Sequence, residues 1–285
     1  MHYLQVDVFA EQEGGGNPLA VFADAADLES SQMQAMAAEL GLSETSFVLS
    51  VDDRGYDVRI FTPAEELPFA GHPTLGTTWV LRHLDRVGSA EVVQRSAAGE
   101  TRVVEEAGLL WFERDGASSR DLDETSTRAR DDIASALGLE PGDIGAEALT
   151  IGRSGHLRPA YSSAGLEHLM VPVRDVAALG SVAVDDERLA SLTPHGAYCF
   201  TGIGAGRLQA RGFFSPVGIP EDPATGSAVG SLGLYLAARV GPIRCEVRQG
   251  TEMGRPSVLH LDASEDRVRV GGRCRLALEG DLRPR

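Results

Sequence analysis

The sequence predicts an α+β protein built from two matched halves. Segments in which apolar and polar residues alternate, a pattern typical of strands, recur along the 285 residues. Each half also contains one nearly uncharged segment that is typical of an enclosed helix, at 73–84 and 225–240. An aromatic-hydroxyl-proline step precedes each of them, F-T-P from Phe61 and F-S-P from Phe214, 153 residues apart. This spacing indicates an internal repeat.

A second pair of segments supports the repeat. N-P-L-A-V-F-A-D-A-A-D-L at 17–28 aligns with H-L-M-V-P-V-R-D-V-A-A-L at 168–179, at a spacing of 151 residues. The length allows two domains of ordinary size, and the repeat favours them. We therefore expect a first domain at 1–115 and a second at 116–266.

The domain boundaries follow from local sequence. Arg114–Asp132 is polar, has no apolar period and is the expected linker. Arg267–Leu278 alternates well and is expected to return as a strand of the first domain, within a returning segment near 267–285.

Strands in the first half are expected wherever apolar residues alternate, at His2–Phe9, Leu19–Phe22, Thr45–Ser50, Tyr56–Phe61, Glu91–Glu105 and Leu109–Glu113. A helix is expected up to Leu40, with Ser30 or Ser31 as its N-cap and Gly41 as its stop. A short helix is expected at 133–137, after which the second half repeats the strand-rich pattern.

Glycines inside the second central helix indicate how it packs. Gly226, Gly230 and Gly233 lie in the segment 225–240. Each interior glycine costs about 1 kcal/mol of helix stability. That cost is understandable if other groups pack directly against the helix backbone.

Composition excludes several classes of function. The net charge is −16, which argues against nucleic acid or an anionic membrane as a partner. All 26 basic residues are arginine, so a lysine Schiff base, a lysine general base and a Walker A loop are excluded. No histidine or cysteine pair has metal-ligand spacing, and no G-x-G-x-x-G follows a strand. We therefore expect neither a metal nor another cofactor.

A cytoplasmic location is expected. The N-terminus M-H-Y-L-Q-V-D lacks the regions of a signal peptide, and the longest uncharged run, 223–238, is too short and glycine-rich for a membrane span. Cys199, Cys245 and Cys274 are odd in number and widely spaced, so we expect free thiols in a reducing compartment.

The two turns before the central helices are the main candidates for a site. Gly71-His72-Pro73-Thr74 and Ala224-Thr225-Gly226-Ser227 both combine small and hydroxyl residues. A helix N-terminus presents unpaired N–H groups and partial positive charge, which bind carboxylates and oxyanions. Each turn alone would be explained by ordinary capping, but their equivalent places in a duplicated chain favour a site.

Three further side chains are candidates, each with a structural alternative. His72 could donate to a substrate heteroatom or carry a proton near neutral pH, or it could simply cap or pack. Asp222 precedes the second turn and could be functional or a solvated turn residue. Glu44, in G-L-S-E-T-S-F-V-L, enters an apolar strand, where desolvation could suit it to acid/base work.

Four ordered motifs give the chain a recognisable family resemblance. G-N-P-L-A-V (16–21), S-E-T-S-F-V (43–48), P-F-A-G-H-P-T-L-G-T (68–77) and E-D-P-A-T-G-S-A (221–228) resemble those of the PhzF, or phenazine-biosynthesis-like, family. The resemblance covers most of the chain. It implies the diaminopimelate epimerase-like fold: two pseudo-symmetric domains, each a β-barrel-like sheet wrapped around a central helix, with the active site in the interdomain cleft. It also implies a homodimer.

The resemblance implies a role for each matching residue. Glu44 would be the acid/base of a cofactor-independent proton-shift isomerisation. His72, Asp222 and Ser227 would contact the substrate, and the amides around Gly71 and Gly226 would hold its carboxylate. Ser43 and Asn17 would be secondary contacts.

The expected substrate is a small carboxylate, possibly a cyclic amino acid like trans-2,3-dihydro-3-hydroxyanthranilate. Epimerases of the same fold use two cysteines at these turns, and here the turns contain none. No second carboxylate matches Glu44, because the equivalent stretch is near His195-Gly196. A single proton carrier favours isomerisation, whereas a two-base pairing of Glu44 with Asp222 would favour stereoinversion. An amino-acid epimerase or racemase and a non-catalytic small-molecule-binding protein are the alternatives.

Overall fold

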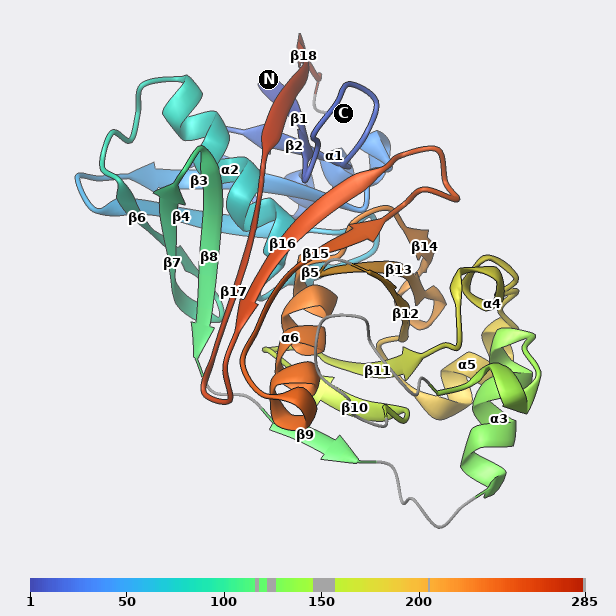
Figure 1. Ribbon diagram of the computed structural model, residues 1–285. Helices are drawn as coiled ribbons and strands as arrows, with labels where there is room; N and C mark the ends of the chain where they lie inside the picture. The colour runs from blue at the N-terminus through green and yellow to red at the C-terminus, as the bar shows by residue number, and fades with distance from the viewer. Residues whose placement is uncertain (116–117, 122–126, 146–156, 205, 284–285) are drawn as a thin grey trace. The chain divides into compact units, whose positions relative to one another are not determined.

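The computed structural model describes residues 1–115, 118–121, 127–145, 157–204 and 206–283 (Figure 1). The chain divides into two compact units. The first comprises Met1–Glu113 and Gly271–Arg285, and the second comprises Arg114–Val270.

The first unit is a mixed sheet with two long helices. Its elements are, in chain order, β1 (His2–Val8), β2 (Asn17–Phe22), α1 (Ser30–Leu40), β3 (Glu44–Val51), β4 (Gly55–Phe61), β5 (Glu66–Leu67), α2 (Gly71–His83), β6 (Glu91–Ser96), β7 (Gly99–Glu106), β8 (Leu109–Asp115) and, from the C-terminus, β18 (Cys274–Asp281).

The second unit has a similar series of elements. They are β9 (Ser118–Asp121), α3 (Thr127–Leu137), the 3₁₀ turn η1 (Pro141–Asp143), β10 (Ala160–Ser163), β11 (Glu167–Pro172), α4 (Val176–Gly180), α5 (Asp186–Leu192), β12 (Ala197–Gly204), β13 (Arg207–Phe214), the 3₁₀ turn η2 (Ser215–Val217), β14 (Ile219–Asp222), α6 (Gly226–Val240), β15 (Ile243–Gln249), β16 (Ser257–Ala263) and β17 (Arg267–Gly272).

The strand pairing of the two units is the same. In the first, β1–β2 is antiparallel, β2–β3 parallel, β3–β4 antiparallel and β4–β6 parallel. In the second, β10–β11, β11–β12, β12–β13 and β13–β15 repeat this order of directions. The outer strand is also matched, since β18 pairs with β1 and β9 pairs with β10, both antiparallel. The internal repeat seen in the sequence is thus a repeat of topology.

The central helices α2 and α6 lie among the strands of their own units (Figure 1). Most residues of both helices are buried. At Gly233 of α6, a Cβ atom would lie 2.6 Å from Leu261 Cδ1 and 2.9 Å from Ala263 Cβ. The expected reason for the interior glycines is therefore confirmed there: strands pack directly against the helix backbone.

A smaller cluster packs beneath α1. Phe22 stacks on Phe47 with ring centroids 5.0 Å apart, and Phe61 meets Phe47 edge-on at 5.5 Å. Met33 and Met36 of α1 cover these rings. The helix ends at Gly41, as predicted, with a positive φ of 63°.

The N-cap of α1 differs from the prediction. Glu29 is the cap, and its side chain and that of Gln32 form a reciprocal capping box. Ser30 and Ser31 are already inside the helix. A glutamate in an extended conformation can therefore replace the expected hydroxyl group, because its side chain accepts from the Gln32 backbone and the Gln32 side chain accepts from the Glu29 backbone.

Three segments differ from the predicted elements. The expected linker Arg114–Asp132 contains β9 and the start of α3, while 116–117 and 122–126 lie outside the described residues. Glu91–Glu105 forms two strands, β6 and β7, which pair as a hairpin. Arg267–Leu278 is also two strands, and β18 is the part that pairs with β1. Short polar strands gain their stability from a neighbouring strand, which local alternation does not reveal.

No helix among the described residues is both long and apolar enough to cross a membrane.

Candidate active site

The first unit gathers three predicted site residues around the start of α2. Asn17 begins β2, Glu44 begins β3, and His72 is the second residue of α2. Glu44 Oε2 lies 3.5 Å from His72 Nδ1, and Asn17 Nδ2 lies 3.5 Å from the same nitrogen. Parallel pairing of β2 with β3 sets Glu44 beside Leu19, two residues after Asn17. Sheet register therefore brings these polar groups together.

Burial determines the charge of His72. Its side chain is 4% exposed, and burial lowers the pKa of the imidazole from 6.5 to about 3. The ring is therefore neutral at physiological pH, which disfavours a role in carrying a proton near neutral pH. A neutral imidazole can still donate or accept a hydrogen bond.

The second ring nitrogen of His72 has no hydrogen bond of normal geometry. Nε2 is buried and has no such partner among the described residues, although the backbone of Pro18 is close enough to the ring to affect its pKa. A buried polar atom without a partner costs about 1–3 kcal/mol. Such a cost is commonly found where a group serves binding or chemistry instead of stability.

A buried polar network stiffens α2 just behind this group. Tyr56 hydroxyl lies 2.8 Å from Thr78 Oγ1 and donates to Gln94 Oε1 at 3.0 Å. Gln94 Nε2 in turn donates to Thr74 Oγ1 at 3.0 Å. The first turns of α2 are thus tied to β4 and β6, which fixes the position of His72.

The second unit gathers the other predicted residues at the start of α6. Asp222 ends β14, and Gly226 and Ser227 are the first two residues of α6. Thr225 Oγ1 donates to Asp222 Oδ2 at 2.5 Å, which holds the carboxylate against the turn. Asp222 is 5% exposed, so the solvated turn aspartate considered from the sequence is wrong.

Gln249 on β15 organises this turn. Its Nε2 donates to Asp222 O at 2.7 Å and Thr225 Oγ1 at 3.0 Å. Its Oε1 accepts from Tyr198 hydroxyl at 2.7 Å and from Thr225 N at 3.2 Å. The side chain is fully buried. It uses all its capacity to fix the backbone leading into α6.

His168 lies beside the hydroxyl group of Ser227. His168 Nε2 and Ser227 Oγ are 3.4 Å apart. The imidazole is 1% exposed, and burial lowers its pKa from 6.5 to about 3. Its ring meets Phe214 edge-on at a centroid distance of 5.3 Å.

The structure therefore places the predicted residues in two groups, one per unit. Asn17, Glu44 and His72 form the first, with Ser43 preceding Glu44 and Gly71 preceding His72 in the chain. The second is Asp222, Gly226 and Ser227.

Sequence reasoning did not identify His168, Tyr198 or Gln249. His168 has a signal, because it aligns with Asn17 in the 151-residue repeat. Tyr198 and Gln249 lie in strands whose pattern marks them only as buried.

Strand register also changes the counterpart of Glu44. Glu44 pairs with Leu19, and the repeat aligns Leu19 with Met170, which pairs with Tyr198. Strand pairing therefore makes Tyr198 the residue of the second unit that is equivalent to Glu44, in place of the His195-Gly196 stretch expected from the sequence. Burial and then Asp222 raise the pKa of the Tyr198 phenol well above 10.0, so the phenol is protonated at neutral pH and a role as a second base is disfavoured.

The three cysteines are not among the residues of either group. All three are free thiols, and Cys199 and Cys245 are buried. Burial raises the pKa of each of these two thiols to about 12. Thiolate chemistry at these two positions is therefore disfavoured at neutral pH.

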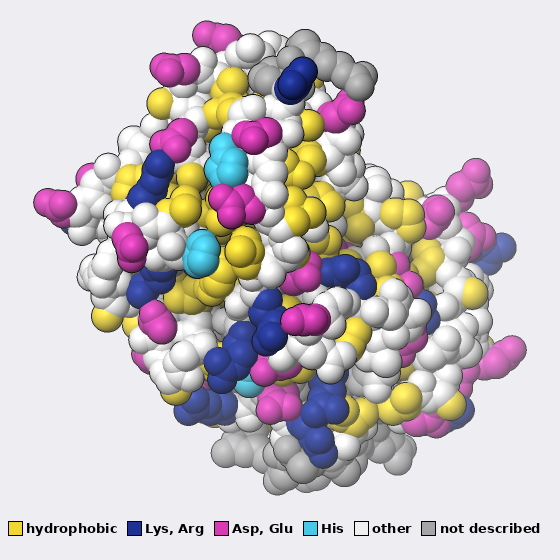
Figure 2. All heavy atoms as spheres, turned by 90° about the horizontal axis from the view of Figure 1, so that it is seen from above, with side chains coloured by type: hydrophobic (Ala, Val, Ile, Leu, Met, Phe, Trp, Pro, Cys, Tyr) yellow, Lys and Arg dark blue, Asp and Glu magenta, His cyan; other side chains and the backbone are white. Residues whose placement is uncertain are grey.

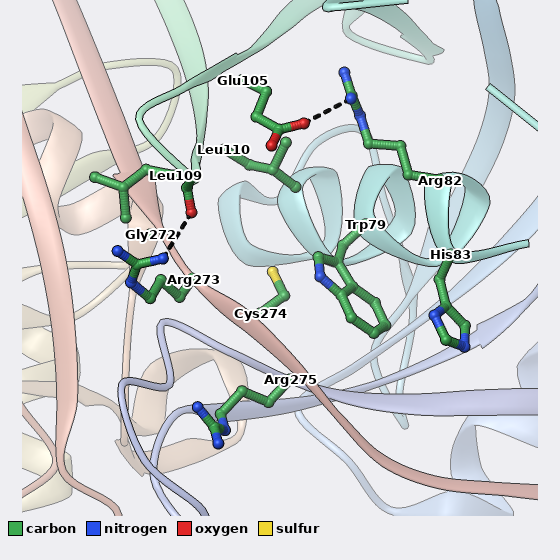
Figure 3. A pocket seen from close by; sticks show the side chains of 11 residues that line it. Trp79, Arg82, His83, Glu105, Leu109, Leu110, Gly272, Arg273, Cys274 and Arg275 are labelled. Atoms are coloured by element: carbon green, nitrogen blue, oxygen red, sulfur yellow. Dashed lines mark hydrogen bonds and ion pairs between the residues drawn. The ribbon is translucent and has the colours of Figure 1, made fainter. Parts of the chain in front are cut away.

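A pocket of about 480 Å³ in the first unit is separate from these groups. Figure 3 shows Trp79, Arg82 and His83 projecting from the last turns of α2 along its wall. Arg82 pairs with Glu105 at 2.7 Å, and Arg273 donates to Gly108 O at 3.0 Å (Figure 3). None of the candidate residues lines this pocket, and those of the first unit lie at the opposite end of α2.

Comparison with known structures defines the class of fold. A PhzF-family phenazine biosynthesis protein from Bacillus anthracis superposes with a TM-score of 0.85 at 24% identity, over 99% of this chain and 98% of the other. A protein from Pseudomonas aeruginosa described as a predicted epimerase gives 0.79 at 34% identity, over 99% and 98%. A probable proline racemase from Agrobacterium radiobacter gives 0.59 at 12% identity, over 99% and 92%, which is a likeness of fold alone. The protein is a sheet-dominated α+β protein of this class.

Sequence comparison gives the family. The family model for phenazine biosynthesis-like proteins matches residues 6–280. A trans-2,3-dihydro-3-hydroxyanthranilate isomerase from Pseudomonas chlororaphis is 36% identical over 92% of this chain and 90% of its own. An uncharacterised isomerase from Mesorhizobium japonicum is 33% identical over 99% and 98%. The chain belongs to the PhzF family, as its motifs predict, and is an isomerase.

Proposed function

We propose that this isomerase shifts a proton within a small carboxylate-bearing substrate, a cyclic amino acid of the trans-2,3-dihydro-3-hydroxyanthranilate type, without a cofactor. The observation that carries the proposal is the pairing of Glu44 with His72 at 3.5 Å. It sets a carboxylate that is 12% exposed beside an imidazole that burial keeps neutral. A carboxylate in such a place can take up and return a proton without a competing basic group.

Each residue of the first unit has a defined task in this proposal. Glu44 removes a proton from a substrate carbon, the electron pair of the broken C–H bond displaces the neighbouring double bond, and Glu44 returns the proton to a different carbon on the same face. His72 holds a substrate amine or hydroxyl through Nε2, which has no hydrogen bond of normal geometry among the described residues. Asn17 holds the ring of His72 in position.

The residues of the second unit are proposed to bind and position. Gly226 and Ser227 form the first turn of α6, whose N–H groups attract a carboxylate. Asp222 contacts the amine or hydroxyl of the substrate, and its bond from Thr225 fixes the orientation of the carboxylate. Gly71 and Ser43 complete the set as backbone and secondary contacts.

A single mobile proton carrier favours isomerisation over stereoinversion. Inversion requires a base on each face of the substrate carbon. On the strand register, the second unit has Tyr198 in the place of Glu44, with a phenol pKa raised by burial. The alternative in which Asp222 is a second base predicts inversion at the α-carbon, which the following experiment detects.

NMR in deuterated buffer tests the proposal directly. Wild type, Glu44→Gln and Glu39→Gln are incubated with trans-2,3-dihydro-3-hydroxyanthranilate and with a panel of small cyclic and acyclic amino acids. We expect wild type and the Glu39→Gln control to isomerise one of them and introduce solvent deuterium, and Glu44→Gln to be at least about 100-fold slower.

The other outcomes distinguish the rivals. Deuterium at the α-carbon with loss of optical activity would establish an epimerase or racemase. Saturable binding without exchange would establish a binding protein, and isomerisation that survives Glu44→Gln would remove Glu44 from its role.

The finer architecture is part of the same proposal. We propose that the two units are pseudo-symmetric domains with boundaries near 1–115 and 116–266, each a barrel-like sheet around its central helix. Both groups of residues would then serve one substrate in an interdomain cleft. Support comes from the family and from the matched strand pairing of the units.

We further propose a homodimer in the cytoplasm, with no nucleic acid or membrane partner. Leu276 and Leu278 of β18 are 41% and 40% exposed, and Figure 2 shows apolar side chains exposed between charged ones on one face. Apolar surface of this kind is common at subunit contacts. Sedimentation at micromolar concentration tests the dimer, and a monomer there would refute it.

A further inference from the structure

The contact between His168 and Ser227 repeats a contact of the first unit. In the first unit, Val8 pairs with Asn17 across β1 and β2, and Asn17 meets His72 at the second position of α2. In the second unit, Ser162 pairs with His168 across β10 and β11, and His168 meets Ser227 at the second position of α6. The two pairs therefore occupy the same place in the two copies of the topology.

A second correspondence shows that this alignment is correct. Val8 and Ser162 both face the sixth residue of their central helix. A Cβ on Gly76 of α2 would lie 2.8 Å from Val8 Cγ2. Ser162 Oγ donates to the carbonyl oxygen of Ser231 in α6 at 2.8 Å. The strands and helices are thus in the same register in both units. The histidine of the pair lies on the helix in the first unit, as His72, and on the strand in the second, as His168.

We propose that His168 is a positioning residue that holds the Ser227 hydroxyl in one orientation for the substrate. This inference rests on the proposed function, in which Ser227 binds the substrate carboxylate at the start of α6. Ser227 is only partly buried, so its hydroxyl can reach a ligand, whereas the His168 ring behind it is almost completely buried. His168 therefore acts through Ser227.

The surroundings of His168 suit a fixed support. Phe214 holds the ring edge-on, and Phe214 is itself confined, since a Cβ on Gly196 would lie 2.7 Å from its ring. Nδ1 is buried and has no hydrogen-bond partner of normal geometry among the described residues, although the backbone of His195 is close enough to affect the pKa. Nε2 faces Ser227, and its hydrogen bond with the Ser227 hydroxyl is the one that orients this hydroxyl.

Ser227 and His168 do not form a nucleophile and its base. Burial holds the pKa of His168 near 3, so the ring has little affinity for the hydroxyl proton. A serine nucleophile needs a base that accepts a proton near the working pH. A neutral ring can, however, hold a hydroxyl group without introducing charge, and this is what a positioning residue requires.

A double-mutant cycle tests the proposal in the full-length protein. His168→Phe keeps an aromatic ring against Phe214 but removes the hydrogen bond. We expect it to lower kcat/KM roughly 5- to 30-fold, mostly through KM, because a contact that positions a bound carboxylate acts in ground and transition states alike. In the Ser227→Ala background, the same substitution should change kcat/KM less than about 2-fold, since its effect passes through the missing hydroxyl.

Two variants serve as controls. His168→Asn uses the residue that occupies the equivalent place in the first unit, and it should recover part of the loss. His260→Asn, elsewhere in the second unit, should leave kcat/KM unchanged. An equal loss from His168→Phe in both backgrounds would overturn the proposal and make His168 a purely structural residue.

A spectroscopic measurement keeps the contact testable without activity. The ¹H–¹⁵N spectrum of the imidazole rings reports on Nε2 directly. Ser227→Ala should shift the His168 Nε2 signal and leave that of His260 unchanged. If wild type turns over no substrate, the proposed function fails while this measurement still decides the contact. An unshifted His168 signal would refute the contact whatever the activity.

Discussion

At the residue scale, burial assigns different roles to groups of similar chemistry. His72 and His168 are both almost completely buried and both have a pKa lowered to about 3, so neither carries charge near neutral pH. Glu44 is partly exposed beside His72 and is the proposed proton carrier. In the proposed mechanism the two histidines therefore orient other groups by hydrogen bonds, and the carboxylate of Glu44 moves the proton.

The buried histidines make stability depend on pH. Above about pH 6.5 each ring is neutral in the folded and unfolded states and contributes nothing. Below this value each imidazole binds a proton in the unfolded chain but stays neutral in the folded protein. The free energy of unfolding therefore falls as the pH drops towards 3. At pH 5 the loss is about 2 kcal/mol for each ring.

Urea unfolding at pH 7 and pH 5 measures this dependence. His168→Asn should lose about 2 kcal/mol less between the two pH values than wild type. The same pH dependence in His168→Asn and wild type would show that the imidazole is not neutral through burial.

At the element scale, the central helices are positioned by close contact with their strands. Gly233 of α6 has no room for a side chain against the sheet, and polar networks around Gln94 and Gln249 fix the starts of the two helices. The candidate groups are located at these starts. Precision at the site therefore depends on how each helix is held.

Replacing a glycine that faces the sheet should loosen this packing. In Gly233→Ala the new Cβ would lie 2.9 Å from Ala263 Cβ, which has no rotamer by which to move away. We expect the free energy of unfolding to fall by about 2 kcal/mol, despite the better helix propensity of alanine. Gly230→Ala, whose nearest neighbour would be 3.2 Å away, should cost clearly less in the same urea titration. Equal effects would contradict the packing argument.

Arg211 holds several elements near Asp222. It donates to both carboxylate oxygens of Glu221 at 2.8 and 2.9 Å, and to the carbonyl oxygens of Leu179 and Val182 at 3.1 Å. It therefore joins β13, β14 and the end of α4. Its side chain is 10% exposed.

Arg211→Met should lower the free energy of unfolding by about 3 kcal/mol, because it leaves Glu221 and the carbonyl groups without their donor. Arg102→Met provides the comparison. Arg102 pairs with Glu91 at the surface, with both side chains about half exposed, and its loss should cost less than about 1 kcal/mol. Chemical denaturation of both variants checks the difference, and similar values would show that Arg211 has no special role.

At the scale of the whole molecule, the first unit is completed by the end of the chain. β18 pairs with β1 along its full length, from His2 with Asp281 to Val8 with Cys274. The matching strand in the second unit, β9, precedes β10 in the chain, with α3 and η1 between the two strands. The two units therefore have the same strand pairing, but their outer strands come from different places in the chain.

A chain that ends at Val270 should lose order in the first unit and retain it in the second. Without β18, the β1 amides have one fewer strand to protect them. Hydrogen exchange read by mass spectrometry should show fast exchange in peptides of β1 and β2, and near wild-type protection in α6 and β15. A chain ending at Arg283, which keeps β18, is the control. Unchanged protection of β1 in the shorter chain would show that the first unit does not need its returning strand.

The sequence by itself determined the repeat, the two central helices and most of the candidate site. Spacing is enough for this, because both copies keep aromatic-hydroxyl-proline steps and small residues at equivalent places. Motif residues such as Glu44 and Asp222 could be read without coordinates. The N-cap of α1 and strand β9 could not, because each depends on one favourable partner instead of a pattern.

Tertiary structure alone decided which side chains meet and how they are charged. His168, Tyr198 and Gln249 lie on strands far from residues 222–227 in sequence, and only sheet register brings them to α6. The neutral state of His72 likewise follows from enclosure, which local sequence does not specify. Strand register and desolvation are properties of the packed sheet, so only the folded structure determines which of these residues meet and which are neutral.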